Sequence, residues 1–410
     1  MRSATLMHIA FSEAEEIVRE TGSACRTDSE RVLLSRARGR ILSEAQFATM
    51  DMPPFHQSSM DGYAVRCADV EAQMPLQVIG EQRAGADVQL VVGKGETVAV
   101  FTGSVLPQGA DSVLIKENAV RRDAGPVFGT VVPTEGKWVR LPGEDMRRGE
   151  LLFHAGHRLA SADIGVLAAC GLHDVLCARR PIIALFTLGD ELAAPGASLA
   201  RGMVYDSNRA MLMSFLAEEG FEPLAWPILR DDPEVIASAL RDAAVSADLL
   251  LTCGGVSVGT YDHLPKLMEI EGETIFHKIR CKPGGPVLFG RFGSTLWLGL
   301  PGNPVSTLAM WLCLGRALVD AMQGAAAPRP LLRARLRSAF VKNENRAEFM
   351  RGTLACGSDG QLWAEADLIT GSHRIAAAAR NNALLVLPEG TAEFEEGCVI
   401  EAIPFGPLGE

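Results

Sequence analysis

Between residues 180 and 325, short apolar runs that suit buried strands alternate with segments whose apolar residues recur at helical spacing. The runs Ile182–Leu188 and Leu249–Thr252 are almost wholly apolar, as strands covered on both faces are. Asp206 and Asp232 stand where N-caps would open the intervening helices. Such alternation allows few folds, and it predicts a doubly wound parallel sheet with ligands at the carboxyl ends of its strands.

The rest of the chain differs in pattern from this region. A chain of 410 residues exceeds what one hydrophobic core usually serves, so two to four domains are expected. Short β-type runs between Gly and Pro indicate β-rich domains on either side, and helices are expected to begin near Ser12 and near Asp28. The expected domains are residues 1–43 with 151–179 (helical, linking), 44–150 (β-rich insertion), 180–327 (doubly wound, ligand-binding) and 328–410 (β-barrel or sandwich).

Bulk properties exclude several classes of protein. A net charge of -11 argues against a nucleic-acid-binding surface. No apolar run approaches the roughly 18 residues of a membrane helix, and Glu13, Glu15 and Glu16 interrupt the stretch where a signal peptide would be apolar. Nine scattered cysteines without a CxxC pair indicate reduced thiols rather than a zinc site or disulfides. We therefore expect a cytoplasmic protein without nucleic-acid or membrane partners.

A glycine-rich loop directly follows the second apolar strand. Residues 254–259 read Gly-Gly-Val-Ser-Val-Gly, and glycine lets backbone N–H groups approach a ligand closely. Gly254, Gly255, Ser257 and Gly259 are therefore candidate ligand-binding residues. The spacing is neither GxGxxG nor a phosphate loop ending in Lys-Ser or Lys-Thr, and a tight turn without a ligand also explains it.

Acidic side chains follow three of the expected strands. Glu191, Asp231 and Asp262 would converge on one edge of a parallel sheet. Carboxylates suit Mg²⁺, which binds oxygen ligands and bridges phosphates, and Glu191 and Asp262 are the candidate metal ligands. Helix capping or solvation is the alternative for both, and for Asp232, ahead of Pro233, capping is the preferred interpretation.

The densest basic cluster of this region lies at residues 278–282. In an extended segment, Lys278, Arg280 and Lys282 share one face, and a Pro-Gly turn follows them. This row suits an oxyanion or a phosphate, although an edge strand guarded by lysine has the same pattern. Farther along, the turn Pro301-Gly302-Asn303-Pro304 joins a strand to a long helix. A rigid structural loop and a ligand-binding site explain this turn equally well.

Two turns in the β-rich insertion carry single acids. Asp61 lies in Ser-Met-Asp-Gly-Tyr-Ala at residues 59–64, and Asp145 ends Pro-Gly-Glu-Asp at residues 142–145. A purely structural role in forming the turn also explains each acid. No Ser-His-Asp, Cys-His or HExxH arrangement stands out in the sequence, so nothing indicates a nucleophilic or zinc-dependent mechanism.

Ten segments together resemble the molybdopterin molybdenumtransferases, the family of MoeA and the E domain of gephyrin, in order and in spacing. Each segment alone is weakly diagnostic, but ten in order over nearly the whole chain are highly specific. The matching segments are Ser59–Ala64, Phe101–Gly103, Pro142–Asp145, Gly189–Leu192, Tyr205–Asn208, Gly254–Gly259, Lys282–Gly284, Pro301–Pro304, Phe349–Gly352 and Gly371–His373.

This resemblance implies both a fold and a reaction. The fold would have four domains, including a doubly wound pterin-binding domain and a small C-terminal β-domain, in an elongated homodimer. The reaction would insert molybdate into adenylylated molybdopterin with the help of Mg²⁺, release AMP and give molybdenum cofactor. The implied protein partners are a molybdopterin adenylyltransferase and proteins that mature molybdoenzymes.

The resemblance also implies roles for individual residues. Molybdate is a dianion, so lysine, arginine and hydroxyl donors are the expected lining, while the acids would hold the metal ion. The implied catalytic residues are Asp61, Thr102, Asp145, Glu191, Asp231, Asp262, Lys278 and Lys282. The implied substrate-binding residues are Gly254, Gly255, Ser257, Gly259, Lys282, Pro283, Pro301, Asn303, Pro304, Arg351 and Ser372.

Two positions depart from the family's pattern. Gly285 stands where the family often has lysine, which would leave the oxyanion pocket with one charge fewer. Leu188 stands where a threonine usually precedes Gly-Asp-Glu, which removes a hydroxyl near the metal.

The rival functions are a nucleotide-cleaving enzyme on the same pterin-binding fold and a scaffold that only binds partners. The flanking β regions disfavour the first, and the retained acids disfavour the second.

Overall fold

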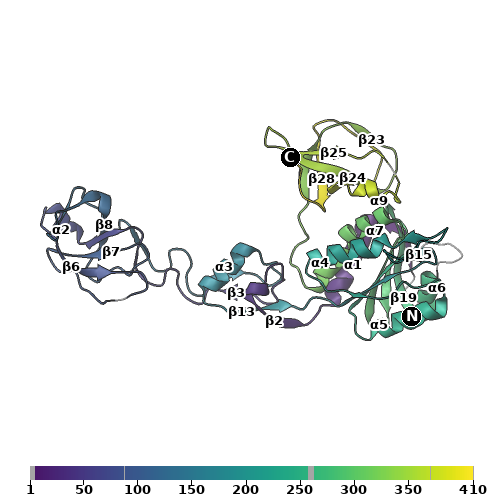
Figure 1. The fold of residues 1–410 in the computed structure, drawn as a ribbon, viewed down its shortest axis with the longest axis horizontal. Coiled ribbons are helices and arrows are strands. Elements are labelled where there is room, and N and C mark those ends of the chain that lie inside the picture. The colour runs from purple at the N-terminus through teal and green to yellow at the C-terminus, as the bar shows by residue number, and fades with distance from the viewer. Residues whose placement is uncertain (1–4, 87, 257–262, 370, 410) are drawn as a thin grey trace.

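The computed structural model describes residues 5–86, 88–256, 263–369 and 371–409. They form an elongated molecule (Figure 1). A β-rich distal domain lies at one end, a small linking domain follows, and a large α/β domain lies at the other end beside a C-terminal β domain. This arrangement confirms the multidomain α/β fold expected from the sequence.

The large domain is built on a sheet with the strand order β17-β14-β18-β21-β20-β19. β14 and β18 are buried along their whole length, as their apolar runs predict. β20, which the sequence did not reveal, runs antiparallel to both neighbours because tight turns join it to β19 and β21. The strands are β1 (Leu6–Ala10), β14 (Ile183–Thr187), β15 (Leu192–Ala193), β16 (Val204–Tyr205), β17 (Leu224–Ala225), β18 (Leu249–Cys253), β19 (Gly272–Lys282), β20 (Leu288–Phe292) and β21 (Thr295–Leu300).

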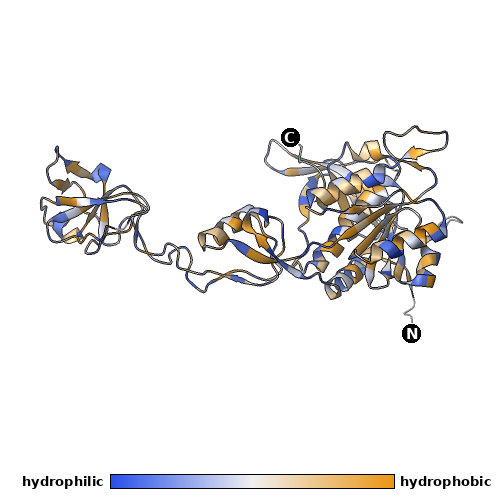
Figure 2. Cartoon of the chain, turned by 60° about the horizontal axis from the view of Figure 1, so that its bottom comes forward, coloured by the Kyte–Doolittle hydropathy of each residue, from blue (hydrophilic) through white to orange (hydrophobic). Residues whose placement is uncertain are grey.

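Helices cover both faces of this sheet, so its apolar strands lie between them (Figure 2). α1, α4 and the helix of α7, η3 and α8 contribute to one core cluster, and α5 and α6 contribute to the other. The helices are α1 (Phe11–Ala24), α4 (Ser207–Glu218), α5 (Pro233–Ala244), α6 (Leu264–Glu271), α7 (Pro304–Met310), the π-helical turn η3 (Trp311–Gly315) and α8 (Arg316–Met322).

The helix from Pro304 to Met322 is long and apolar enough to cross a membrane by length and composition. In the folded chain, however, 94% of its most apolar window is buried inside the protein. It packs against the sheet with Trp311 and Leu314 fully buried. Its hydrophobicity is therefore that of a core helix.

Residues 5–24 belong to the large domain rather than to the linking domain expected from the sequence. β1 pairs in parallel with β19, with Leu6 opposite Phe276. α1 packs on α8 so closely that a methyl group at Gly22 would come within 2.9 Å of the Ala321 side chain. The buried face of α1 explains this placement, because an amphipathic helix of this length needs a larger core than the linking domain offers.

The linking domain is mostly β structure. The expected helix after Asp28 is absent, because residues 29–33 form strand β2, which pairs with β13 and places Val32 in a small apolar core. Its elements are β2 (Ser29–Leu33), η1 (Leu34–Arg36), β3 (Gln46–Phe47), β12 (Leu151–Phe153), α3 (Ser161–Ala169) and β13 (Asp174–Ala178).

The remaining two domains are β-rich, as predicted. In the C-terminal domain, β22, β28, β26, β24 and β25 close into a barrel, since β25 also pairs with β22. The distal domain has the sheet β6-β7-β5-β8. Distal elements are β4 (Gln57–Ser58), β5 (Gly62–Val65), α2 (Cys67–Glu71), β6 (Gln77–Gln82), β7 (Glu96–Val100), β8 (Ser112–Ile115), η2 (Lys116–Asn118), β9 (Ala119–Arg121), β10 (Val127–Gly129) and β11 (Val139–Arg140). C-terminal elements are β22 (Leu332–Leu336), β23 (Phe340–Lys342), β24 (Ala347–Cys356), β25 (Leu362–Ala366), α9 (Ile375–Ala378), β26 (Ala383–Leu387), β27 (Ala392–Phe394) and β28 (Val399–Pro404).

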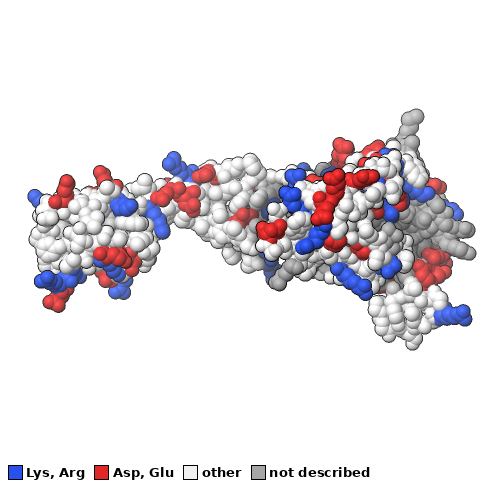
Figure 3. Space-filling model, turned by 90° about the horizontal axis from the view of Figure 1, so that it is seen from above, with Lys and Arg blue, Asp and Glu red and all other residues white. Residues whose placement is uncertain are grey.

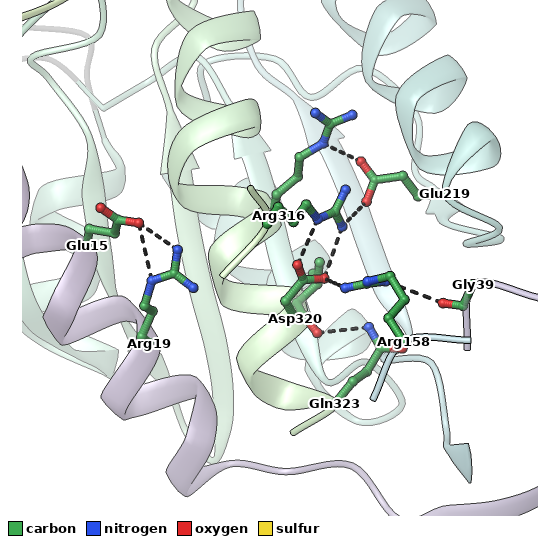
Figure 4. Close-up of polar contacts among 10 residues, drawn as sticks. Glu15, Arg19, Gly39, Arg158, Glu219, Arg316, Asp320 and Gln323 are labelled. Carbon is green, nitrogen blue, oxygen red and sulfur yellow. Dashed lines mark hydrogen bonds and ion pairs between the residues drawn. The ribbon is translucent and has the colours of Figure 1, made fainter. Parts of the chain in front are cut away.

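A buried carboxylate joins three of these parts (Figure 4). Asp320 on α8 accepts hydrogen bonds from Arg158 of the linking domain and, at 2.7 Å, from Arg329 of the connection to the C-terminal domain. Arg329 also donates to Glu219, which pairs with Arg316. The network therefore ties the linking domain, α8 and the connection to the barrel at one point.

Charged side chains of both signs are interspersed on the face that Figure 3 presents, from the distal domain to the large domain. An anionic ligand would therefore depend on local positive charge in a cavity rather than on a broad basic surface.

Candidate functional site

Two adjoining cavities lie at the carboxyl ends of the large-domain strands. One, of about 750 Å³, is lined by Glu191, Asp206 and Asp231 and is called here the acidic cavity. The other, of about 440 Å³, is lined by Lys282 and Arg351 and is called the basic cavity. Both are bordered by Pro286, Pro301 and Asn303. Each is within the size range of small-molecule sites, and together they would hold a ligand with two chemically different ends.

Glu191 is positioned by the turn after β14. Gly189 has φ +148°, and a side chain there would come within 2.4 Å of a Glu191 carboxylate oxygen. Glycine is therefore needed for the Glu191 carboxylate to fold back over the chain at the cavity wall. The loop after β18 also needs a glycine. Gly254 has φ +95°, and a side chain there would come within 2.6 Å of the Leu188 carbonyl oxygen.

The Asp231 carboxyl group of this cavity lies close to two other acids. The pKa of Asp231 is raised first by partial burial and then by the nearby carboxylates of Asp190 and Glu191. The backbone N–H of Asp231 donates to Asp190 at 3.3 Å, which fixes the two loops together. Crowded carboxylates of this kind are stabilised by a bound cation.

Two carboxylates of the acidic cavity fit a hard divalent ion of the Mg²⁺ type. In the part of the chain that the structure describes, no group of three His, Cys, Asp or Glu side chains is arranged to hold a metal ion. Glu191 and Asp231 nevertheless line one cavity, and Mg²⁺ is commonly held by one or two carboxylates together with substrate phosphates and water. Asp262, Ser257 and Gly259, which the sequence also indicated, lie outside the described residues.

Two further side chains of the acidic cavity, Asp206 and Asn208, were not among the site residues predicted from the sequence. Asp206 does cap α4, but its carboxylate also accepts from the Thr187 hydroxyl at 2.6 Å and pairs with Arg209. Asn208 donates to the Gly302 carbonyl at 2.6 Å, and its side-chain oxygen is buried without a hydrogen-bond donor among the described residues. Asn208 is therefore a candidate ligand-binding residue. By contrast, Asp232 only caps α5, as predicted.

The basic cavity is formed where the end of β19 meets the C-terminal barrel. Lys282 pairs with Glu344 at 2.9 Å and with Glu348 at 3.4 Å. Burial alone would lower the pKa of Lys282, but these carboxylates outweigh it and raise that pKa. The predicted residues Pro283, Pro301, Asn303 and Ser372 line the same cavity. Arg351 is there too, although its guanidinium already binds the carbonyls of Arg374 and Ile369 and the Asp367 carboxylate.

The structure does not bring all three basic residues of 278–282 to the basic cavity. Lys278 has φ +65°, and buried and more exposed side chains still alternate from Lys278 to Lys282. Arg280 is exposed and pairs with Glu389 at 3.2 Å. Of these three residues, only Lys282 is among the described residues that line the basic cavity. Lys278 lines neither cavity.

The acids predicted in the distal domain lie in neighbouring turns. Asp61 accepts from the Thr102 backbone N–H at 2.9 Å and from its hydroxyl at 3.1 Å, and it pairs with Lys116. The hydrogen bonds from Thr102, followed by Lys116, hold the pKa of Asp61 below its usual value. Asp145 lines a shallow hollow with Arg140. These residues form a polar surface of the distal domain.

This distal polar surface and the two cavities lie at opposite ends of the molecule (Figure 1). The linking domain separates them, so within one chain Asp61 and Thr102 are remote from Glu191 and Lys282. The residues to which the resemblance gives roles therefore form two separate groups within a single chain.

Comparisons with known proteins cover almost the whole chain. Residues 9–171 match the MoeA N-terminal region (domains I and II), residues 184–321 match a probable molybdopterin-binding domain, and residues 333–405 match the MoeA C-terminal region (domain IV). A molybdopterin molybdenumtransferase of Haemophilus influenzae is 31% identical over 93% of this chain and 95% of its own. One of Nostoc is 33% identical over 90% of this chain and 87% of its own.

Solved structures agree with this relationship. The molybdopterin biosynthesis MoeA protein of Pyrococcus horikoshii OT3 superposes with a TM-score of 0.82 at 25% identity, covering 97% of this chain and all of its own. Both flanking β regions and the large domain are included in these matches. The chain therefore belongs to the molybdopterin molybdenumtransferase family of MoeA proteins.

Proposed function

We propose that this protein inserts molybdate into adenylylated molybdopterin, releases AMP and so completes molybdenum cofactor. The observation that carries the proposal is the junction of an acidic and a basic cavity at one edge of the sheet, bordered on both sides by Pro286, Pro301 and Asn303. A nucleotide–metal end of the substrate suits the first cavity, and an oxyanion suits the second. All nine cysteines are free thiols, which supports a cytoplasmic location.

In the acidic cavity, Glu191 and Asp231 would hold Mg²⁺ together with substrate phosphate oxygens, and Asp262 is a further expected ligand. When bound, Mg²⁺ supplies positive charge that polarises the link to AMP. Asp206 holds Thr187 and Arg209 in fixed positions beside this site. The chain's own contribution is thus to orient the phosphates and to compensate their charge.

In the basic cavity, Lys282 and Ser372 would bind molybdate beside the pterin dithiolene. Charge-assisted hydrogen bonds to an oxyanion are stronger than neutral ones and fix its orientation. Arg351, held by three partners of its own chain, would keep this wall rigid. No side-chain nucleophile is needed, because molybdenum passes directly to the sulfur atoms of the substrate.

The distal polar surface would complete the site from a second copy of the chain. In a two-fold dimer, each elongated protomer would place its Asp61, Thr102 and Asp145 beside the partner's cavities, which gives two equivalent sites. The separation within one chain supports this arrangement. Lys278, which lies on the strand that leads to the site, is also expected to contact the substrate.

The proposal is tested by mixing the protein with adenylylated molybdopterin, Mg²⁺ and molybdate. Release of AMP together with formation of active cofactor is the expected result, read by nucleotide chromatography and by reconstitution of a cofactor-free molybdoenzyme. Release of AMP without cofactor would support the rival nucleotide-cleaving activity. Absence of both products would contradict any catalytic role.

Replacing Glu191 by Gln is expected to slow AMP release by about 100-fold at low Mg²⁺, because metal-borne charge contributes several kcal/mol to such steps. Part of the loss should be recovered at high Mg²⁺. The measurement is the initial rate as a function of Mg²⁺ concentration. Glu218→Gln, on the exposed side of α4, is the control and should match the parent. A Glu191→Gln curve equal to the parental one would refute the metal role.

A further inference from the structure

One cation of the basic cavity comes from the C-terminal barrel and was not indicated by the sequence. Arg346 lies between β23 and β24, and it lines the cavity beside Lys282 and Ser372. The start of β24 pairs in parallel with the end of β19, with Ala347 opposite Cys281 and Glu348 opposite Lys282. This pairing fixes Arg346 next to the lysine from the large domain.

The loop that carries Arg346 is itself anchored. Lys342 is buried, and its amine donates to the Glu344 carbonyl at 2.7 Å and to the Gly390 carbonyl. The Glu344 side chain is 40% exposed and faces two cations, since Lys282 and Arg346 both pair with it. These cations hold the pKa of Glu344 below its usual value. Glu344 is therefore an anion of the chain itself at the mouth of the cavity.

Arg346 retains binding capacity beyond this ion pair. Its Nε atom is buried and has no hydrogen-bond acceptor among the described residues. A buried donor without an acceptor is unfavourable, and it usually indicates an unseen partner. Arg351 differs, because its guanidinium is engaged by three acceptors. The planar fork of arginine suits two oxygens of one oxyanion.

We propose that Arg346 is a further oxyanion-binding residue of the basic cavity, and that Glu344 is an internal anion displaced when the oxyanion enters. The oxygens of the entering anion would replace the Glu344 carboxylate as the hydrogen-bond acceptors of Lys282 and Arg346. Glu344, already partly exposed, would then turn to solvent. A dianion would compete with Glu344 better than a monoanion, so this exchange favours tetrahedral dianions. The identity of the anion as molybdate rests on the proposed function.

The test is calorimetric titration of the full-length protein with molybdate and, separately, with sulfate. Arg346→Ala is expected to weaken binding of both dianions by roughly tenfold or more, the effect of losing a charge-assisted hydrogen bond. Glu344→Gln is expected to tighten binding severalfold, because Lys282 and Arg346 lose their internal competitor. Arg333→Ala removes an exposed charge from β22 of the same barrel and should bind like the parent.

Opposite effects of the two variants separate ligand binding from a structural role, because damage to the loop would weaken binding in both. If Arg346→Ala fails to fold, Arg346→Lys keeps the charge without the fork and is expected to bind less tightly than the parent. Parental binding by Arg346→Ala, weaker binding by Glu344→Gln, or no dianion binding by the parent would each overturn the inference. The expected titrations from a protein that makes no cofactor would contradict only the proposed function.

Discussion

Homodimers that carry Asp61→Ala and homodimers that carry Glu191→Ala are each expected to be inactive, whereas mixed dimers of the two regain activity. The reason is geometric, since Asp61 and Glu191 lie in domains at opposite ends of one chain (Figure 1). If each site combines Asp61 of one protomer with Glu191 of the other, a mixed dimer has one site with both lesions and one intact site. Its activity should reach up to half of the parental value per dimer.

The mixed dimer can be isolated by co-expression with two different affinity tags and assayed for cofactor formation. Asp123→Ala, at the exposed turn between β9 and β10 of the distal domain, is the matched control and should stay active as a homodimer. Mixed dimers that remain folded and dimeric but inactive would contradict the shared site. If the Asp61→Ala homodimer is active, the distal polar surface takes no part in the reaction.

The parts of the fold that could be predicted are those fixed by local pattern. The apolar runs at β14 and β18 identified strands buried on both faces, and Asp232 before Pro233 identified the start of α5. Acids that follow parallel strands of this sheet fall on one edge because parallel strands end together. Glu191 and Asp231 accordingly line the same cavity.

The parts that could not be predicted depend on contacts between distant segments. Residues 29–33 become a strand because β13 pairs with them, and α1 joins the large domain because α8 offers it an apolar face. Arg346 carries no local signal, since only the pairing of β24 with β19 brings it to Lys282. Lys278 lines neither cavity, and the alternation of residues 278–282 could not show how far along β19 the cavity reaches.

Replacing Asp320 by Ala is expected to destabilise the junction of the domains at neutral pH by about 1–3 kcal/mol, because it removes a buried carboxylate to which the partly exposed side chains of Arg158 and Arg329 both donate. Asp320 is nearly inaccessible to solvent, and Arg158 and Arg329 both donate to it (Figure 4). The effect should appear as a lower denaturation temperature by calorimetry. Asp242→Ala, an exposed acid near the end of α5, removes the same charge without this network and should change stability little.

The destabilisation should also depend on pH in a defined direction. Burial alone would raise the pKa of Asp320, but the hydrogen bonds and charges of Arg329 and Arg158 outweigh it, and the pKa lies below its ordinary value. A depressed pKa in the folded state gives stability that is present above the unfolded-state pKa and is lost as the pH falls through the folded-state pKa. The difference between parent and Asp320→Ala should therefore be full at neutral pH and shrink at acidic pH below the usual carboxyl range. A difference that stays constant with pH would show that Asp320 stabilises the junction by packing and not by its charge.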